Sequence, residues 1–446
     1  TRARMISAAE AKEKFPLLEE DVICGALWDP DAGLVAPRSQ TVAGELVDEA
    51  VASSKLQSFP NTPATDLLVE NGRIKGVVTH RGTIEAEYVI NCAGLWGRQI
   101  AEMVGEDLPV MPVDHPLTFF GPFNEFEGTG KDIGYSLLRD QGNSAYMRDT
   151  GDPKTPEGGQ IEWGYYEEKE PRLCHPRDLQ SKAEARLSPS QRDLEMDQIM
   201  EPLERAMELT PILGEIGYNE AYSFNGLLQV TTDGGPSIGE SQKVRGLWYA
   251  VAIWVKDGPG MAKLLVDWMT DGRTEIDHNP IDYARFYPFQ TEEQFIHDRC
   301  YESAFKIYNP AVHPREPYSK GRSIRRSPFY EREVELGGHF MELGGWERAH
   351  GYAANDHLLE KYADQVPVRE SEWDNRHFYR VSNAEHLEMS NNVGMVNLTH
   401  FAMYDITGPD HVAFMEYLCA AKVGGDNQVG KGIYTHFLDE NGMVRA

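Results

Sequence analysis

A glycine-rich turn that opens a helix is the segment of this sequence whose residue types and spacing point most clearly to chemistry. Residues 247–257 read LWYAVAIWVKD, a strand-like apolar run, and Gly258, Pro259 and Gly260 begin the helix-like segment that follows. The first turn of a helix carries unpaired backbone N–H groups and a positive dipole end, and here almost no side chain covers them. The turn therefore suits a phosphate, or the N1/C2=O edge of a flavin that becomes anionic when reduced. The structural alternative is an ordinary strand-to-helix connection.

Two other turns are also built from small residues. Residues 89–97, VINCAGLWG, read as a buried strand that ends at small residues and leads into an amphipathic helix expected over 96–104. Without bulky side chains, backbone can approach a flat ligand closely. Residues 231–241, TTDGGPSIGES, form a Gly/Pro-rich polar turn just before the strand that feeds the glycine-rich helix. Each turn is common by itself, so it is the order of the three turns along the chain that points to a ligand-binding site.

Hydrophobic periodicity predicts the elements that position these turns. We expect helices over 8–14, 41–53 and 191–209, strands over 55–59, 113–120, 145–149 and 159–166, and a three-stranded meander over 65–69, 74–78 and 84–90. The meander has Asn71-Gly72 and Arg81-Gly82 as its turns, which favour tight reversals. A last hairpin is expected near the end of the sequence, with Asn441-Gly442 as its turn.

The order and spacing of these segments resemble the FAD-dependent amine oxidoreductases of the glycine, sarcosine and dimethylglycine group. The segments that carry the resemblance are 9–20, 31–39, 90–97, 109–115, 223–241 and 252–273. Downstream, residues 325–348 and 393–409 are similar to the junction and the start of the aminomethyltransferase module of dimethylglycine oxidases and dehydrogenases. The resemblance thus extends over almost the whole chain.

The resemblance implies an α/β plus α+β fold in several parts. The expected parts are a Rossmann-like FAD domain in two pieces, 1–105 and 214–272, an inserted antiparallel-β substrate domain at 106–213, a middle module at 273–335 and the start of an aminomethyltransferase (GcvT-like) fold at 336–446. No GxGxxG follows an early strand, although a dinucleotide-binding fold needs one. We therefore expect an interior piece of a longer polypeptide, whose upstream part carries most of the ADP contacts and whose downstream part carries most of the folate module.

The chemistry implied by the resemblance is oxidation of an N-methylated amino acid, dimethylglycine or sarcosine, by hydride transfer to FAD. His115, in PVDHP, matches a histidine that relatives place beside the flavin. Tyr166 matches a tyrosine facing it, with Tyr165 the alternative if the alignment shifts by one residue. Without the family, the plainer interpretation is that His115 caps a loop and Tyr166 fills a core.

The resemblance also assigns cofactor contacts. The matching residues are Ala64, Cys92, Ala93, Gly94, Trp96, Gly234, Gly235, Pro236, Gly258 and Gly260. Asp257 departs from the histidine that some relatives have there, and an acid aimed at the flavin would oppose the helix dipole, so we expect it to face solvent or cap the helix.

The implied second module would transfer the one-carbon product to tetrahydrofolate. Gly345-Trp346-Glu347-Arg348 fits its opening motif, whereas residues 349–352 depart from the usual Pro-x-Trp-Phe. No folate ligand is assigned. The acceptor of the flavin electrons is expected to be oxygen or an electron-transfer partner.

Composition bounds the class of protein. With 71 Asp and Glu against 43 Lys and Arg, the formal net charge is −28, which argues against nucleic-acid binding and against an anionic membrane surface. No apolar run reaches the roughly 18 residues that span a bilayer. The five cysteines are scattered without a CxxC, which favours reduced thiols. We expect a cytoplasmic enzyme, or a mitochondrial-matrix one in a eukaryote.

Three other functions compete with this interpretation. Gly235-Pro236-Ser237-Ile238-Gly239 satisfies the GxSxG pattern of serine hydrolases, but that pattern needs a strand before the serine and a helix directly after it. His297 and Cys300 form only a lone pair of metal-ligand types. The remaining alternative is a folate-dependent aminomethyltransferase-type protein without flavin activity.

Overall fold

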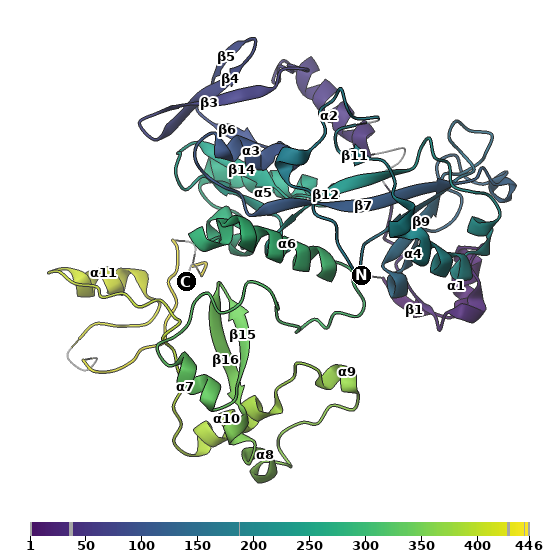
Figure 1. Cartoon of the computed structure of the whole chain (residues 1–446). Coiled ribbons are helices and arrows are strands. Elements are labelled where there is room, and N and C mark those ends of the chain that lie inside the picture. The colour runs from purple at the N-terminus through teal and green to yellow at the C-terminus, as the bar shows by residue number, and fades with distance from the viewer. Residues whose placement is uncertain (1, 35–38, 187, 426–428, 441, 445–446) are drawn as a thin grey trace.

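The computed structural model describes residues 2–34, 39–186, 188–425, 429–440 and 442–444. Figure 1 shows the sheets of the N-terminal part in its upper half and the hairpin β15 (Gly338–Leu343) and β16 (Trp346–Tyr352) in its lower half. Helix α6 (Glu293–Lys306) lies between them and packs against the central sheet. Its Arg299 pairs with Glu342 of β15 at 2.5 Å, with both side chains buried, so this helix joins the two halves.

A six-stranded antiparallel sheet forms the middle of the protein. Its strands, in spatial order, are β11 (Gln191–Arg192), β12 (Phe224–Thr231), β7 (Val110–Phe120), β10 (Ile161–Tyr165), β9 (Ala145–Asp149) and β8 (Leu138–Asp140). The strands expected over 113–120, 145–149 and 159–166 are therefore confirmed. β12, which the sequence-based boundaries place with the second FAD segment, is hydrogen-bonded along its whole length to β7.

A smaller sheet carries the three glycine-containing turns. β6 (Val89–Asn91) runs parallel to β14 (Leu247–Val251), and β13 (Ser237–Glu240) is antiparallel to β14. The parallel pair requires both strands to end at the same edge. β6 leads through a 3₁₀ turn into α3 (Gly97–Glu102), and β14 leads into α5 (Gly258–Asp271). The chain thus brings residues 92–94 and the start of α5 to one edge of the sheet.

The remaining elements near the N-terminus are short. They are β1 (Arg4–Ile6), α1 (Ala8–Lys14), β2 (Ala26–Trp28), α2 (Ser39–Ala52) and the meander β3 (Ala64–Glu70), β4 (Arg73–Thr79) and β5 (Gly82–Glu85). α1 begins at a capping box in which Ser7 and Glu10 satisfy each other's backbone N–H groups. The helix expected over 8–14 is confirmed, and the one expected over 41–53 is found as α2. Of the resembling segment 31–39, residues 35–38 lie outside the described part.

Four sequence-based boundaries are wrong. Residues 55–59 form no strand; they are exposed and pair with no other strand among the described residues. Residues 84–90 split between β5 and β6, which belong to different sheets. The helix expected over 191–209 begins only at Met196, because 191–192 pair with β12. The helix expected over 96–104 is a 3₁₀ turn followed by α3, which ends at Glu102. Local periodicity could not show these strand pairings, which decide where each element ends.

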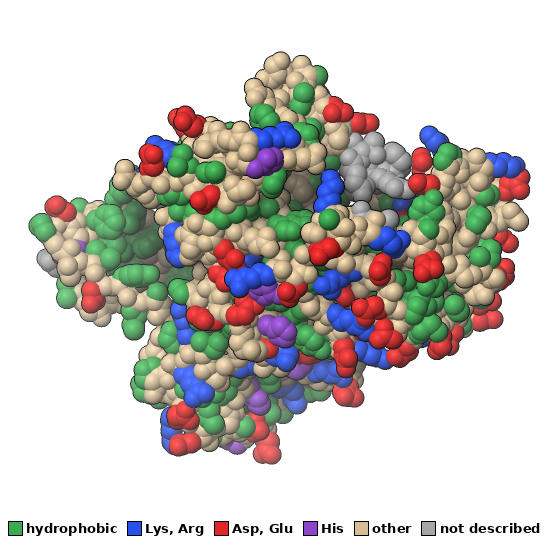
Figure 2. Space-filling view, turned by 45° about the horizontal axis from the view of Figure 1, so that its top comes forward, with side chains coloured by type: hydrophobic (Ala, Val, Ile, Leu, Met, Phe, Trp, Pro, Cys, Tyr) green, Lys and Arg blue, Asp and Glu red, His purple; other side chains and the backbone are tan. Residues whose placement is uncertain are grey.

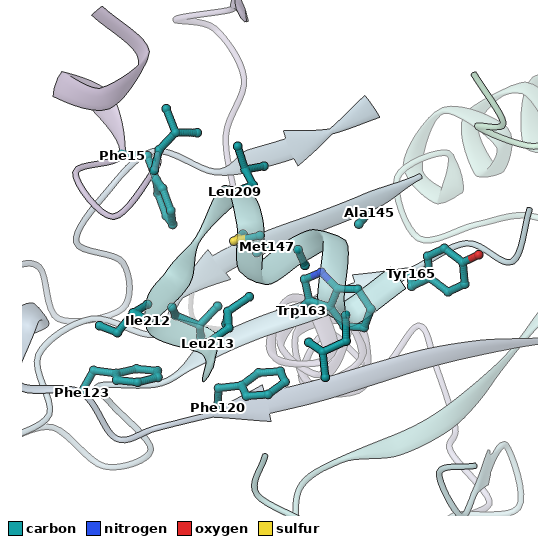
Figure 3. Packing of buried hydrophobic residues seen from close by; sticks show 14 of the residues in the cluster. Phe15, Phe120, Phe123, Ala145, Met147, Trp163, Tyr165, Leu209, Ile212 and Leu213 are labelled. Atoms are coloured by element: carbon teal, nitrogen blue, oxygen red, sulfur yellow. The ribbon is translucent and has the colours of Figure 1, made fainter. Parts of the chain in front are cut away.

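The largest core lies between the six-stranded sheet and α4 (Met196–Leu209). Ile199, Leu203 and Ala206 lie on one face of α4 at helical spacing and are at most 5% exposed. Figure 3 shows this helix lying across strands that present Met147, Trp163 and other apolar side chains. The core holds β7, β9 and β10 in register, and these three strands carry the side chains of the candidate site.

The C-terminal part is built around the β15–β16 hairpin. Its turn, Gly344 and Gly345, has positive φ angles of 58° and 83°, which favour glycine. Glu347 of the opening motif is buried and pairs with Arg322 of the middle module. The helices here are α7 (Tyr330–Glu335), α8 (Leu358–Lys361), α9 (Glu372–Asn375), α10 (Arg380–Asn391) and α11 (His411–Leu418). The last expected hairpin is present as an isolated bridge between Leu438 and Val444, although Asn441 lies outside the described residues.

The surface mixes charges of both signs. Figure 2 shows acidic and basic side chains interspersed over one face, with hydrophobic side chains gathered at the left, where Figure 1 places α11. Val412, Phe414 and Tyr417 of that helix are 44%, 51% and 86% exposed. Within the described residues, no helix is long and apolar enough to cross a membrane.

Candidate active site

One cavity of about 2800 Å³ connects the two sheets. It is larger than the roughly 300–1,000 Å³ of a pocket for a drug-sized ligand, so a dinucleotide and a small substrate have room in it. Of the twelve sequence-predicted site residues, five line it: Cys92, Gly94, His115, Tyr166 and Gly258. The cavity therefore joins the strand-end turns of one sheet to the aromatic face of the other.

The glycine turns at Gly94 and Gly258 form an open cradle on the cavity wall, and Gly260 lies just outside its lining. A Cβ added at Gly94, Gly258 or Gly260 would meet no protein atom within 4 Å. Gly94 has a φ of +53°, a conformation that other residues adopt only at a cost. The N–H of Gly260 has no hydrogen-bond partner within the described part of the chain, and no side chain caps α5. These features fit the flat ring of a flavin with its N1 edge at the start of α5.

A buried glutamine ties the two turns together. Gln229 of β12 donates from Nε2 to the Gly94 carbonyl at 2.9 Å, and its Oε1 accepts from the Ala252 N–H at 2.8 Å. Ala252 lies between β14 and α5 and has a positive φ of 52°. The Gln229 carbonyl also accepts from the Trp254 indole at 3.0 Å. The sequence reasoning missed Gln229, because its role depends on β12 lying beside both turns.

Gln229→Leu tests this bridge. The variant leaves the Gly94 carbonyl and the Ala252 N–H without their partners, so we expect the free energy of unfolding to fall by about 1–3 kcal/mol and flavin affinity to fall with it. Denaturant titration and flavin titration measure the two effects. Gln99→Leu is the control, since Gln99 makes one bond, to the Pro176 carbonyl, and does not line the cavity. Unchanged flavin affinity in Gln229→Leu would contradict the bridging role.

His115 stands in an aromatic group that lines the same cavity. Its Nε2 lies 2.8 Å from the hydroxyl of Tyr146, and its ring centroid is 4.4 Å from that of Tyr166. Tyr146 is on β9, directly across from Gly164 of β10, and its ring occupies the space that a side chain at 164 would need. Gly164 thus lets Tyr146 reach over one strand to His115 on β7. Sequence reasoning missed Tyr146, and only the register of three strands reveals it.

Burial sets the protonation states of this group. It lowers the pKa of His115 to about 4, because the imidazolium form loses its hydration, so the ring is neutral at pH 7. Burial also raises the pKa of Tyr146 and of Tyr166, so both phenols keep their protons. A neutral imidazole hydrogen-bonded to a protonated phenol leaves this wall uncharged, and its buried surroundings favour the free-amine form of a ligand over the ammonium form.

The shifted pKa of His115 predicts a pH-dependent stability. The unfolded chain binds a proton at this residue below pH 6.5, whereas the folded chain binds it only when the pH falls to about 4. Stability should therefore fall as the pH drops from 6.5 to 4, by up to about 1.4 kcal/mol per pH unit from this group. In His115→Gln the free energy of unfolding should vary less over that range. His80→Gln removes an exposed histidine and should keep the wild-type slope; an equal slope in both variants would refute the assignment.

The other predicted contacts lie outside the cavity lining. Ala64 begins β3. The Ala93 N–H binds the Asn91 side chain, and Trp96 belongs to the same 3₁₀ turn. The turn at Gly234, Gly235 and Pro236 is held by the protein itself, since the Gly235 carbonyl accepts from Thr231 at 2.7 Å and from Arg285 at 3.2 Å.

Asp257 occupies the N-cap position of α5 but makes no cap hydrogen bond. Its carboxylate pairs with Lys256 at 2.7 Å and is 27% exposed. The lysine offsets the negative charge that would otherwise oppose the helix dipole.

The rival sites do not form. Ser237 is the first residue of β13, is 1% exposed and is not followed by a helix, so it is no nucleophile elbow. His297 and Cys300 lie on α6, where Cys300 is buried and His297 is paired with Asp298. Across the described residues, no group of three or more metal-ligand side chains is found.

Three family models match consecutive parts of the chain. They are the FAD dependent oxidoreductase model over residues 1–268, the FAD dependent oxidoreductase central domain over 271–327 and the GCVT N-terminal domain over 329–446. This order confirms the expected combination of an FAD-binding fold with an aminomethyltransferase-type domain.

Two curated proteins are similar over almost the whole chain. Mitochondrial dimethylglycine dehydrogenase from Rattus norvegicus is 26% identical over 452 residues, covering 100% of this chain and 49% of the relative. A formaldehyde-forming 4-methylaminobutanoate oxidase from Paenarthrobacter nicotinovorans is 26% identical over 448 residues, covering 99% and 50%. The chain thus spans about half the length of these curated relatives.

The solved structure of L-proline dehydrogenase from P. horikoshii superimposes with a TM-score of 0.50 at 20% identity, covering 64% of this chain and 68% of that one. This similarity concerns the fold. With a family model covering more than half of the sequence and a cavity whose glycine cradle fits a flavin, the chain belongs to the FAD dependent oxidoreductase family.

Proposed function

We propose that this protein oxidises an N-methylated amino acid, dimethylglycine or sarcosine, by removing a hydride from the carbon next to its nitrogen. The observation that carries the proposal is the single cavity in which a glycine cradle faces a neutral histidine hydrogen-bonded to a tyrosine. Relatives whose names specify N-methyl amino acids or their dehydrogenation support the choice of substrate. The cofactor contacts of the proposal are Cys92, Gly94, Gly258 and Gly260, with Ala64, Ala93, Trp96, Gly234, Gly235 and Pro236 as supporting turn residues.

The chain's own residues prepare the amine. Bound FAD supplies the hydride acceptor. A protonated amine cannot release a hydride from its neighbouring carbon, so the site must favour the free amine. Neutral His115 and the protonated Tyr146 hydroxyl that holds it in place add no charge to this wall, so the buried site favours the free amine and His115 can orient it by a hydrogen bond. The ring centroids of Tyr166 and Trp254 lie 6.5 Å apart and the rings are nearly parallel. These rings would keep water from the reacting carbon.

The start of α5 stabilises the other half of the reaction. With a flavin bound, the uncapped first turn of this helix would supply backbone N–H groups and a positive dipole end that stabilise negative charge on the ring. Cys92 is partly solvent-accessible on the same wall, and burial raises the pKa of its thiol, so it stays neutral beside that charge.

The aminomethyltransferase-type domain suggests the fate of the product. Oxidation yields an iminium, and tetrahydrofolate would capture its one-carbon unit as a methylene group in the complete protein. The alternative function, called the runner-up below, is that of a folate-dependent aminomethyltransferase-type protein without flavin activity. Oxygen or an electron-transfer protein is the proposed acceptor, and a reducing compartment, cytoplasm or mitochondrial matrix, is the proposed location.

The test is anaerobic mixing of the purified flavin-bound protein with a panel of N-methyl amino acids. We expect the flavin absorbance to bleach with dimethylglycine or sarcosine and to stay oxidised with glycine, which has no N-methyl group. Protein that purifies without flavin and takes up none would favour the runner-up. Flavin that binds but is bleached by no member of the panel would refute the proposed substrate class.

A further inference from the structure

A buried arginine follows closely after the turn at residues 92–94. Arg98 is the second residue of α3, and its side chain is only 2% exposed. Asn91 holds the turn to this helix, because its Oδ1 accepts from the Ala93 N–H at 3.1 Å and its Nδ2 donates to the Gly97 carbonyl at 2.8 Å. The turn and the start of α3 are thus one hydrogen-bonded unit, and a displacement of Arg98 would move the turn with it.

Two carboxylates from different parts of the chain hold the guanidinium of Arg98. Asp107, in the loop before β7, binds it through two atoms, with 2.5 Å between Nε and Oδ1 and 2.8 Å between Nη2 and Oδ2. Glu293 accepts from the same Nη2 through Oε2 at 2.5 Å. Because Glu293 is the first residue of α6, this contact joins α3 to the middle module across 195 positions of the sequence. Hydrogen bonds between a guanidinium and a carboxylate are among the stronger ones in proteins.

Glu293 can be changed without leaving the buried arginine unpaired. Its side chain is 56% exposed, and Arg98 keeps both contacts to Asp107 when Glu293 is lost. The other oxygen of Glu293, Oε1, lies 3.3 Å from Nε2 of His175. A carboxylate in the first turn of α6 is also favoured by the helix dipole. Substitution at Glu293 therefore tests the link between α3 and α6 in a protein that still folds.

We propose that the contact between Arg98 and Glu293 couples flavin binding at residues 92–94 to the docking of α6 beside α3. Arg98 is a positioning residue in this arrangement, because it acts through the turn and does not line the cavity. A ligand that orders the turn also orders Arg98, and by linkage a docked α6 strengthens flavin binding by the same factor. α6 also pairs through Arg299 with Glu342 of β15, so the middle module connects the flavin turn to the aminomethyltransferase-type domain. The inference rests on the flavin contacts of the proposed function and is independent of the substrate.

Glu293→Gln removes the charge and keeps the approximate size of the side chain. Titration of the flavin-free protein with FAD should show binding about 5- to 10-fold weaker than in wild type, near the lower end of usual coupling because Glu293 is 56% exposed. Asp298→Asn is the matched control, since Asp298 lies on the same helix and contacts only Gln294 and His297 of that helix among the described residues. It removes an equal charge and should change the affinity by less than about twofold. Glu293→Asp keeps the charge on a shorter side chain, so its affinity should lie between those of wild type and Glu293→Gln.

Hydrogen exchange measures the coupling from the side of the helix. FAD should slow exchange of the α6 backbone amides in wild type, and this protection should shrink in Glu293→Gln but persist in Asp298→Asn. A purely structural contact would instead change exchange equally with and without FAD.

Three results would overturn the proposal. They are wild-type flavin affinity in Glu293→Gln, an equal loss of affinity in Asp298→Asn, and an equal loss in His175→Gln, which would assign the effect to His175. If flavin affinity depends on Glu293 but no N-methyl amino acid bleaches the bound flavin, the proposed reaction fails and the coupling stands. If wild type binds FAD and Glu293→Gln binds it equally well, the coupling fails and the flavin site stands.

Discussion

His115→Gln should slow flavin reduction by dimethylglycine about 100-fold or more, with a much smaller change in ligand affinity. The reason is that His115 is neutral and buried, with its pKa lowered to about 4, so it adds no charge to the wall and can orient the free amine from which the hydride leaves. Glutamine keeps polarity and approximate size but lacks the imidazole ring that Tyr146 and Tyr166 hold in place. Stopped-flow measurement of flavin reduction at saturating substrate gives the limiting rate. Titration with methoxyacetate, a carboxylate without a basic amine, gives the ligand affinity of the site.

Two tyrosine variants test the role of His115 further. Tyr146→Phe removes the hydroxyl that lies 2.8 Å from His115 Nε2 and should reproduce part of the rate loss. Tyr165→Phe is the control, since Tyr165 is 1% exposed in the core and its hydroxyl contacts Glu167 rather than the cavity. A His115→Gln protein that reduces its flavin at the wild-type rate would remove His115 from the mechanism. Raising the pH should partly rescue the variant, because more of the free amine is then present in solution.

Gly258→Val is expected to weaken flavin binding by about 100-fold or more while leaving the protein folded. A Cβ at this position meets no protein atom within 4 Å, so the backbone accepts a side chain here and a ligand at the start of α5 would collide with it. Loss of the visible flavin absorbance after purification, and titration of the flavin-free protein with FAD, measure the effect. Thermal unfolding without ligand checks the fold.

Gly44→Val is the matched control for this substitution. Gly44 also lies in a helix, α2, and a Cβ there likewise meets no protein atom within 4 Å, but Gly44 does not line the cavity. Full flavin binding in Gly258→Val would show that the ring lies elsewhere in the cavity. Equal losses in both valine variants would point to a general effect on folding.

Much of the fold could be predicted because its signals are local. The strand–turn–helix order at 247–271, the small residues at 92–94 and the capping box at Ser7 and Glu10 are properties of short segments. The residue types of segment 55–59 favour a strand, but the segment forms none. β-propensity does not show whether a partner strand lies near. β12 is a further example, since its position in the six-stranded sheet depends on pairing with β7 more than a hundred residues earlier.

The candidate site also contains residues that the sequence indicated and residues that only the structure revealed. His115 and the glycine turns at Gly94 and Gly258 were found from the sequence by family resemblance, and the structure places all three on one cavity. Tyr166 was predicted too and lies against His115, but the hydrogen bond to His115 comes from Tyr146. No local pattern marks Tyr146, because its reach depends on a glycine in the neighbouring strand.

The sequence by itself determined the glycine turns, because residue types at fixed short spacings carry them, and its resemblance to a known family indicated the class of protein and His115. Only the tertiary structure decided which side chains meet there. Gln229 joins two turns, Tyr146 crosses Gly164 to His115, and Arg139 lies over Tyr308 from another module. Strand register and the packing of α6 against the sheet set these contacts, and both depend on residues that lie far apart along the chain.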